Sequence, residues 1–305
     1  MDNIQILLFI DIKFTHTEVK INEEERIILM EQSNNCVVQT KNLGKSFGEV
    51  QALKSVNLNI PEHSIFGLLG PAGAGKTTFI KILLGLCCPT SGSGKIFGLD
   101  IVNNRVEICE RVGYLPQRPG FIEYMSAREN LLLTTRFFDL GSKKDTYERC
   151  DEMLELVGLE NRAEIPMKYF ARGEKQLLGI ALAQINYPDL LILDEPVLSL
   201  DPVERQEVFE VIDRIRKDTT IIFSTHILDD VQRISDTVAI LNHGTVEAYG
   251  SIEDLLNEKL SVEDLIIATD IQGQTGKRLS ILDWVKQGHI NQRNSNGTVI
   301  RKVII

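Results

Sequence analysis

A glycine-rich run in the first third of the sequence has the residues and the spacing of a phosphate-binding loop. Residues 70–77 read GPAGAGKT and match the pattern GxxxxGK(S/T), with an apolar run before them and a helix-like stretch after them. Glycines let successive backbone N–H groups converge on a phosphate at the positive end of the following helix. Lys76 would lie between the β- and γ-phosphates of ATP, and the Thr77 hydroxyl would bind Mg²⁺. The alternative is a glycine-rich turn followed by a solvated lysine. The predicted ATP contacts are Gly70, Pro71, Ala72, Gly73, Ala74, Gly75, Lys76, Thr77 and Thr78.

Two adjacent carboxylates follow an apolar run later in the chain. Residues 190–193 read LLIL, and Asp194 and Glu195 come directly after them. Parallel sheets bind their ligands at the carboxyl ends of the strands, so both side chains would face a nucleotide. Asp194 would hold Mg²⁺ and Glu195 would polarise the water that attacks the γ-phosphate. A strand that merely meets solvent would look similar. Together with the phosphate loop, the pair predicts ATP hydrolysis, although neither motif says what the energy drives.

The elements that must position these residues alternate between strands and helices. Residues 190–193 and 220–223 are strand-like, and the amphipathic stretch 202–216 between them predicts a βαβ unit and therefore a parallel sheet. Apolar residues recur at helical spacing through the middle of the chain. The other predicted strands are 37–43, 56–60 and 65–69 with a hairpin of 237–241 and 245–248, and the other predicted helices are 76–86, 127–138, 147–157 and 174–185.

Composition limits the classes of function. The chain has 305 residues, of which 43% are hydrophobic and 25% charged, and its formal net charge is −10. Such an acidic balance argues against a nucleic-acid-binding protein. The five cysteines form no CxxC pair, which favours a reducing cytoplasm over disulfides or zinc. The apolar run 4–10 is too short to span a bilayer and lacks the basic flank of a signal peptide.

Further motifs, in order along the chain, resemble those of the ABC ATPase family. They are GYLPQ at 113–117, FARGEKQ at 170–176, DEP at 194–196, SLDP at 199–202 and STH at 224–226. The resemblance covers about residues 37–252, and the segments 223–231 and 238–250 resemble the subgroup that powers ABC-2 type exporters. It implies an α/β P-loop NTPase fold with a RecA-like mixed or parallel sheet core, an antiparallel β subdomain and a helical subdomain at about 118–187. Residues 1–36 and 253–305 are extensions without an assigned function, the second with a candidate helix at 262–268.

The resemblance also implies roles for single residues. Phe47 would stack on the adenine, Gln117 would touch Mg²⁺ or the attacking water, and His226 would contact the γ-phosphate. Asp201 would lie at the seam of a dimer. Without the resemblance, these residues read as a core aromatic, a loop glutamine, a structural histidine and a helix cap, respectively.

One motif departs from the family pattern. The signature loop, usually LSGGQ, acts in trans on the nucleotide of a second ATPase subunit, and here it reads Phe170, Ala171, Arg172, Gly173, Glu174. Ala171 lacks the hydroxyl that would bond the γ-phosphate, a loss of about 1.5–3 kcal/mol. The Gly173 N–H and the helix dipole remain. Ala72 and Val197 are smaller departures. The second ATPase subunit could be another copy of this chain, but an altered signature beside intact catalytic motifs suggests pairing with a different ATPase that carries the full signature.

The expected function is an ATP-binding and ATP-hydrolysing subunit that energises an ABC transporter, of the exporter type, through a separate transmembrane permease. Its expected place is the cytoplasmic face of the membrane. A translation-type ABC protein would normally carry two cassettes, and a chromosome-maintenance ATPase would separate Lys76 from Asp194 by a far longer heptad segment. An ATP-binding switch with little hydrolysis is the alternative that the altered signature leaves open.

Overall fold

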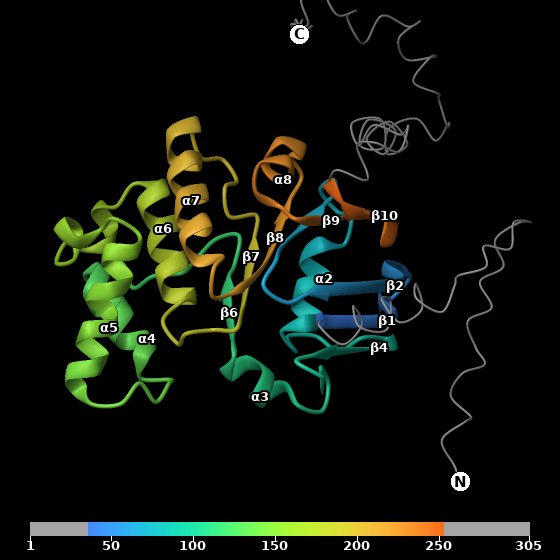
Figure 1. Cartoon of the computed structure of the whole chain (residues 1–305), viewed down its shortest axis with the longest axis horizontal. Helices are drawn as coiled ribbons and strands as arrows, with labels where there is room; N and C mark the ends of the chain where they lie inside the picture. The colour runs from blue at the N-terminus through green and yellow to red at the C-terminus, as the bar shows by residue number, and fades with distance from the viewer. Residues whose placement is uncertain (1–35, 253–305) are drawn as a thin grey trace, which may run out of the picture. The chain divides into compact units, whose positions relative to one another are not determined.

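A computed structural model describes residues 36–252 of the chain. The predictions for the two extensions, including the candidate helix at 262–268, lie outside the described residues except for Cys36. Two sheets and the helices around them make up the described part (Figure 1). The strands are β1 Cys36–Phe47, β2 Val50–Pro61, β3 Ile65–Leu69, β4 Ser91–Ile96, β5 Leu99–Asp100, β6 Val112–Leu115, β7 Leu190–Asp194, β8 Thr220–Thr225, β9 Thr237–Asn242 and β10 Thr245–Ser251. The helices are α2 Lys76–Leu83, α3 Arg105–Glu110, α4 Ala127–Thr135, α5 Lys143–Leu156, η1 Glu160–Arg162, η2 Met167–Tyr169, α6 Arg172–Ala183, α7 Pro202–Ile215 and α8 Leu228–Ile234.

The larger sheet has six strands in the order β10-β9-β3-β8-β7-β6. All neighbouring pairs are parallel except β9 with β10, which form the predicted hairpin. Every residue of β3, β7 and β8 is buried, as expected for parallel strands covered on both faces. The predicted parallel sheet is therefore confirmed.

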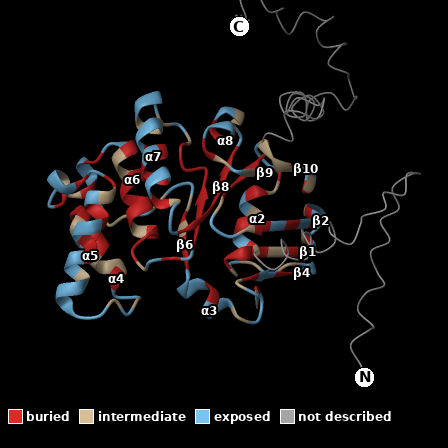
Figure 2. Ribbon diagram, in the orientation of Figure 1, coloured by how far each residue is buried: buried red, intermediate tan, exposed pale blue. Residues whose placement is uncertain are grey.

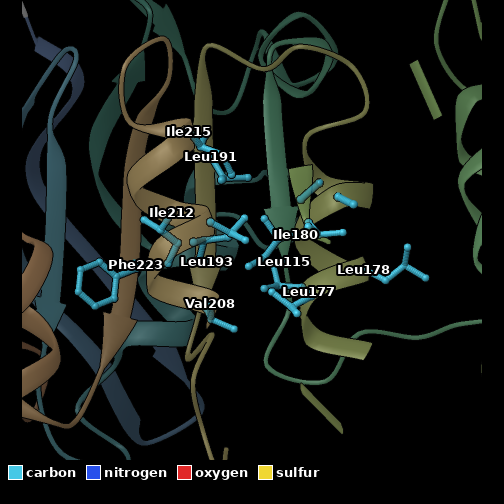
Figure 3. Close-up of a cluster of buried hydrophobic side chains, with 14 of the residues drawn as sticks. Leu115, Leu177, Leu178, Ile180, Leu191, Leu193, Val208, Ile212, Ile215 and Phe223 are labelled. Carbon is cyan, nitrogen blue, oxygen red and sulfur yellow. The ribbon is translucent and has the colours of Figure 1, made fainter. Parts of the chain in front are cut away.

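Alternate residues of these strands enter two separate hydrophobic cores. Leu191 and Leu193 of β7 point to one face, where they pack with residues of α4, α5, α6 and α7 (Figure 3). Leu190 and Ile192 point to the other face, where α2 and the antiparallel sheet cover them. Burial is concentrated around the central strands, while the outer faces of the helices are exposed (Figure 2). The strand period of two thus separates the helical layer from the layer that contains α2.

The smaller sheet is antiparallel, with the order β2-β1-β4-β5. Between β6 and β7 the chain forms helices and 3₁₀ turns without a strand, and α4, α5 and α6 lie at the opposite end of the picture from β1, β2 and β4 (Figure 1). The predicted fold class, an α/β P-loop ATPase with an antiparallel sheet and a helical segment, agrees with this arrangement. No helix within residues 36–252 is long and apolar enough to cross a bilayer.

Several predicted boundaries were wrong for local reasons. Helix α2 ends at Leu83 rather than at residue 86, because Gly85 adopts a φ of +65° and the chain turns away. Strand β1 runs on to Phe47, where a turn at Gly48 joins it to β2. Strand β4 was not predicted, because its residues SGSGKI look like a turn and become a strand by pairing with β1. The short elements β5, β6, α3 and α8 were not predicted either.

Candidate functional site

The phosphate loop joins β3 to α2 and has glycine where a side chain could not fit. A Cβ on Gly70 would lie 2.1 Å from the carbonyl oxygen of Leu241. Gly75, the residue before α2, has a φ of +111°, and a Cβ there would lie 2.6 Å from the carbonyl oxygen of Ala52. Both glycines are therefore required by backbone conformation and close approach.

The β9–β10 turn and the end of β8 hold this loop in place. The Gly244 N–H donates to the Ala74 carbonyl at 2.9 Å, and the Gly70 N–H donates to the Thr225 carbonyl at 3.2 Å. The first N–H groups of a helix have no acceptor within the helix, so those of α2 are available to a phosphate at this loop.

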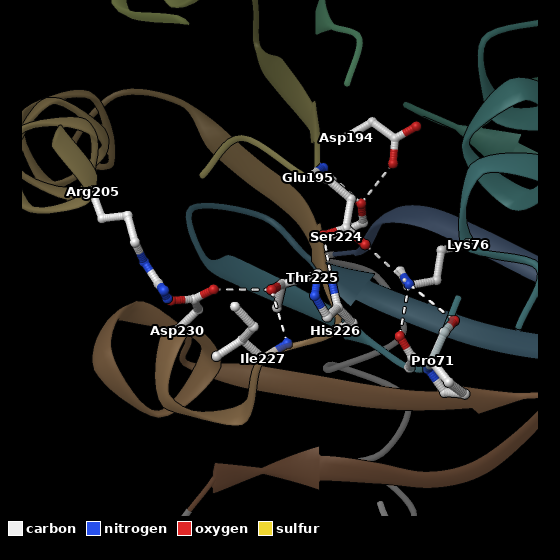
Figure 4. A network of polar contacts seen from close by, with 11 residues as sticks. Pro71, Lys76, Asp194, Glu195, Arg205, Ser224, Thr225, His226, Ile227 and Asp230 are labelled. Atoms are coloured by element: carbon white, nitrogen blue, oxygen red, sulfur yellow. Dashed lines mark hydrogen bonds and ion pairs between the residues drawn. The ribbon is translucent and has the colours of Figure 1, made fainter. Parts of the chain in front are cut away.

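Lys76 connects the phosphate loop to the carboxylates at the end of β7. Its side chain is only 6% exposed, and Nζ donates to the carbonyls of Gly70 at 2.7 Å and Pro71 at 3.2 Å. Nζ also lies 3.1 Å from Oε1 of Glu195 (Figure 4). This ion pair joins the phosphate loop to the acidic pair, a contact that the sequence analysis did not predict.

Ser224, at the end of β8, forms hydrogen bonds with both residues of the acidic pair. Its hydroxyl donates to Oδ1 of Asp194 at 2.6 Å and accepts from the Glu195 N–H at 2.9 Å. All three residues are buried. Sequence reasoning noticed Ser224 only as part of the STH motif and gave it no role. The signal that could have identified this role is a polar residue at the end of β8, the strand that runs parallel to β7.

Glu195 combines a strained backbone with a directed side chain. Its φ is +52°, a conformation that costs energy for a residue other than glycine and is common at functional sites. Oε2 of Glu195 lies 2.9 Å from Nδ1 of His226, so this carboxylate faces both Lys76 and the histidine (Figure 4). Lys76 of α2, Glu195 directly after β7 and His226 directly after β8 thus converge.

Other predicted site residues lie on the surface without a described contact to this group. Phe47 is 54% exposed at the end of β1, and Nζ of Lys45 lies 4.9 Å from its ring centroid. Gln117 is exposed on the loop after β6, the strand that pairs with β7. Thr77 is exposed in the first turn of α2, and Thr78 beside it is half-buried. The loop residues Ala72 and Gly73 are exposed as well.

The oxygen donors at this site are of the kind that Mg²⁺ prefers. Asp194 is buried and offers a carboxylate with one oxygen bonded to Ser224, and Thr77 offers an exposed hydroxyl. Mg²⁺ commonly takes one or two protein oxygens and completes its shell with water and substrate phosphates. Asp194 also influences Tyr114 on β6: burial first, and then the carboxylate charge, raise the pKa of this phenol to about 12.

The signature loop ends in the N-terminus of α6, which lacks a capping side chain. Ala171 occupies the N-cap position without a side-chain hydrogen bond, and the Glu174 carboxylate accepts from the Ala171 N–H at 2.8 Å. The Gly173 N–H donates to Oε1 of Glu204 on α7 at 3.1 Å. Arg172 is exposed. The N-terminus of α6 therefore lacks a side-chain cap, and two carboxylates of the same chain accept from its backbone N–H groups instead.

Asp201 forms the predicted cap of α7. Its Oδ1 accepts from the N–H groups of Val203 at 2.8 Å and Glu204 at 2.9 Å, and Pro202 occupies the first turn. The side chain lies on the exposed surface, so the capping role leaves one face of Asp201 accessible.

Comparison with known proteins places this geometry in a family. The sequence profile described as ABC transporter matches residues 53–198. The chain is 40% identical over 212 residues to the bacitracin transport ATP-binding protein BcrA of Bacillus licheniformis, covering 69% of this chain and 68% of the relative. It is 37% identical over 234 residues to the lantibiotic transport ATP-binding protein SrtF of Streptococcus pyogenes, covering 74% of this chain and 99% of the relative.

The fold agrees with that of solved ATP-binding cassettes. One of them, a dimer in a post-hydrolysis state bound to ADP and Pi, aligns with a TM-score of 0.64 and 28% identity, covering 70% of this chain and 98% of the other. None of these relatives favours the alternative of an ATP-binding switch with little hydrolysis. The chain belongs to the ABC transporter family, and it is an ATP-binding and ATP-hydrolysing subunit of a transporter.

Proposed function

We propose that this chain supplies the energy of an exporter from the cytoplasmic face of the membrane, working with a separate transmembrane permease and a second ATPase subunit. The observation that carries this proposal is the convergence of Lys76, Glu195 and His226 at the carboxyl end of the parallel sheet. The relatives named for bacitracin and lantibiotic transport support the exporter assignment. The working unit would be residues 37–252, with a helical subdomain at about 118–187.

Each residue of the cluster has a role that its contacts permit. The backbone N–H groups from Gly70 to Thr78 would cradle the phosphates, and Lys76 would pair with their oxygens in place of Glu195. Glu195 would then accept the proton of the attacking water, and His226 would orient that water against the γ-phosphate. Mg²⁺, held by Asp194 and Thr77, would neutralise charge on the phosphates. Phe47 would stack on the adenine, and Gln117 would touch Mg²⁺ or the attacking water; both side chains are on the surface.

The signature loop would act on the nucleotide of the second ATPase. Because Ala171 has no hydroxyl, this chain would offer its partner only the helix dipole and, once it leaves Glu204, the Gly173 N–H. The partner would need a complete signature to clamp ATP on this chain's Lys76, Asp194 and Glu195. An asymmetric pair with a different ATPase is therefore favoured over a homodimer, with Asp201 at the seam.

A groove between α3 and the ends of α2 and α4 suits a helical segment of the permease. It encloses about 590 Å³, and its lining includes Leu84, Arg105, Val106 and Phe137. Val106 and Phe137 are 75% and 80% exposed, which is costly for apolar side chains unless a partner covers them. The chain leads from this groove through β6 to Gln117, so a permease bound here would sense the nucleotide site.

Lys76→Ala tests the nucleotide site directly. We expect ATP affinity to fall by about tenfold to a hundredfold for each charge-assisted bond that is lost, measured with a fluorescent ATP analogue. Lys81→Ala, which removes an exposed lysine from the same helix, is the matched control. Equal affinities for the two variants would rule out the phosphate loop as the binding site.

Val106→Glu tests the groove in the intact complex isolated from cells. We expect the permease to be lost from the purified complex while ATP binding is kept. The control is Val50→Glu, since Val50 is 67% exposed at the start of β2, away from the groove. Unchanged recovery of the permease with Val106→Glu would remove this groove from the proposal.

A further inference from the structure

Two neighbouring residues in the first turn of α7 reach two different functional segments. The Glu204 carboxylate accepts a hydrogen bond from the Gly173 N–H in the signature loop, at 3.1 Å. The Arg205 guanidinium pairs with the Asp230 carboxylate of α8, just after the histidine motif (Figure 4). One turn of helix therefore lies between the signature loop and the segment that carries His226.

The contact between α7 and the signature loop is close. A Cβ on Gly173 would lie 2.7 Å from Cδ of Glu204, so the carboxylate packs directly on the backbone of the loop. The other oxygen of Glu204 accepts from the Asp201 N–H at 3.2 Å and completes the capping box of α7. Because one planar carboxylate joins both helix ends, a shift of Gly173 must move Glu204 or break this bond.

The contact between α7 and the histidine segment runs through a buried charge. Asp230 is almost fully buried, and its second oxygen accepts from the Thr225 hydroxyl at 3.0 Å. The Thr225 hydroxyl in turn accepts from the Ile227 N–H at 3.1 Å. Residues on both sides of His226 are thus fixed by one carboxylate, and Arg205 must stay paired with it because an unpaired buried charge is costly.

We propose that the first turn of α7 couples the signature loop to His226, with Glu204 and Arg205 as positioning residues. The inference rests on the proposed trans action of the signature loop. When that loop engages the partner's nucleotide, the displacement would pass through Glu204 and Arg205 to the Asp230–Thr225 pair and turn His226 relative to Glu195. Each subunit would thereby adjust its own catalytic histidine to the state of the other site. Packed helices transmit such shifts because their interfaces adopt discrete arrangements.

The imidazole signal of His226 gives a readout that does not depend on turnover. The five histidines of the full chain are labelled at Cε1, and His226→Gln identifies the signal of interest. We expect Glu204→Ala to shift this signal although Glu204 makes no described contact with His226. Glu207→Ala, an exposed glutamate on the same helix, should leave it in place. An unshifted His226 signal in a folded Glu204→Ala protein would overturn the coupling.

Steady-state kinetics of the full chain give the second readout. Glu204→Ala and Thr225→Val should each lower kcat by about two- to thirtyfold with little change in KM for ATP. The double variant should be no slower than the slower single variant, since both changes break the same link. If the two reductions multiply instead, the residues act independently and the inference is wrong.

Two further variants keep the test decisive. Thr225→Ser retains the hydroxyl and should restore kcat, which a purely structural role of the valine substitution would not predict. If Thr225→Val does not fold, Arg205→Lys takes its place in the comparison of single and double variants. Lysine keeps a positive charge opposite Asp230 but lacks the planar guanidinium group. A wild-type chain no faster than Glu195→Gln would refute the proposed function, whereas the histidine signal would still decide the coupling.

Discussion

The carboxyl end of the parallel sheet and the N-terminus of α6 are built differently, although both would face a γ-phosphate. At the sheet, Lys76, Glu195 and His226 come from three elements and contact one another through polar atoms. At α6, the N-cap residue is Ala171, and the helix end is satisfied by carboxylates of its own chain. Under the proposed function, this chain would thus be equipped to hydrolyse its own ATP but would offer less to the ATP of a partner.

Two other helices of the same chain show what α6 lacks. Ser126 before α4 and Ser142 before α5 each accept from a backbone N–H three residues on, and an acidic residue closes each capping box. Helix α6 keeps only the acidic half of this motif, through Glu174. The absence of the hydroxyl at Ala171 is therefore specific to the signature position and not a general feature of this helical region.

The largest effect is expected for Glu195→Gln, at the carboxyl end of the parallel sheet. We expect kcat to fall by about 10²- to 10⁴-fold because the amide cannot accept the proton of the attacking water. ATP binding should persist. Single-turnover hydrolysis and equilibrium ATP binding measure the two quantities, and Glu207→Gln on α7 is the control. Undiminished turnover would mean that the catalytic base lies elsewhere, and the carboxyl end of the sheet would no longer differ from α6 in catalytic equipment.

Ser224→Ala should affect stability and catalysis together. The change leaves the buried Asp194 oxygen and the Glu195 N–H without their shared partner, so we expect a loss of about 2–4 kcal/mol in the free energy of unfolding. Urea unfolding followed by circular dichroism measures this loss. Ser224→Thr keeps a hydroxyl on the same β-carbon and should recover part of the lost free energy of unfolding. A stability equal to that of the wild type would show that water replaces the hydroxyl.

Ala171→Ser tests the second of the two regions, the N-terminus of α6. The Ala171 backbone already has the extended conformation of an N-cap, so a serine should cap α6 and gain about 0.5–2 kcal/mol in stability. Its hydroxyl should also tighten the ATP-bound dimer by about tenfold to a hundredfold. Analytical ultracentrifugation with ATP measures the dimer. High activity that the reversion does not increase would argue against an asymmetric pair.

The smallest effect is expected for Phe47→Ala, at the exposed end of β1. Loss of one stacking partner should weaken ATP binding by about two- to twelvefold, because aromatic pairs contribute about 0.5–1.5 kcal/mol beyond area burial. Isothermal titration with ATP and with a triphosphate that lacks the base separates stacking from phosphate binding. Equal weakening for both ligands would mean that Phe47 does not contact the adenine.

The sequence predicted those features that depend on local pattern. Strands β3, β7 and β8 were identified because both of their faces are buried, and the phosphate loop because its glycines serve the backbone itself. Strand β4 and the role of Ser224 were missed, since each acquires its partner from a distant part of the chain. The pairing of Glu204 with Gly173 and of Arg205 with Asp230 is likewise set by tertiary packing, which no spacing along the sequence reveals.

The turn between β9 and β10 has a consequence for the order of folding during synthesis. The phosphate loop is backed by Leu241 and Gly244, which the ribosome adds roughly 170 residues after Gly70. At typical translation rates of about 5–20 residues per second, the loop would emerge on the order of 10–35 s before its support exists. The nucleotide cradle is therefore a late product of translation, and nascent chains should gain affinity for ATP only once this hairpin has left the ribosome.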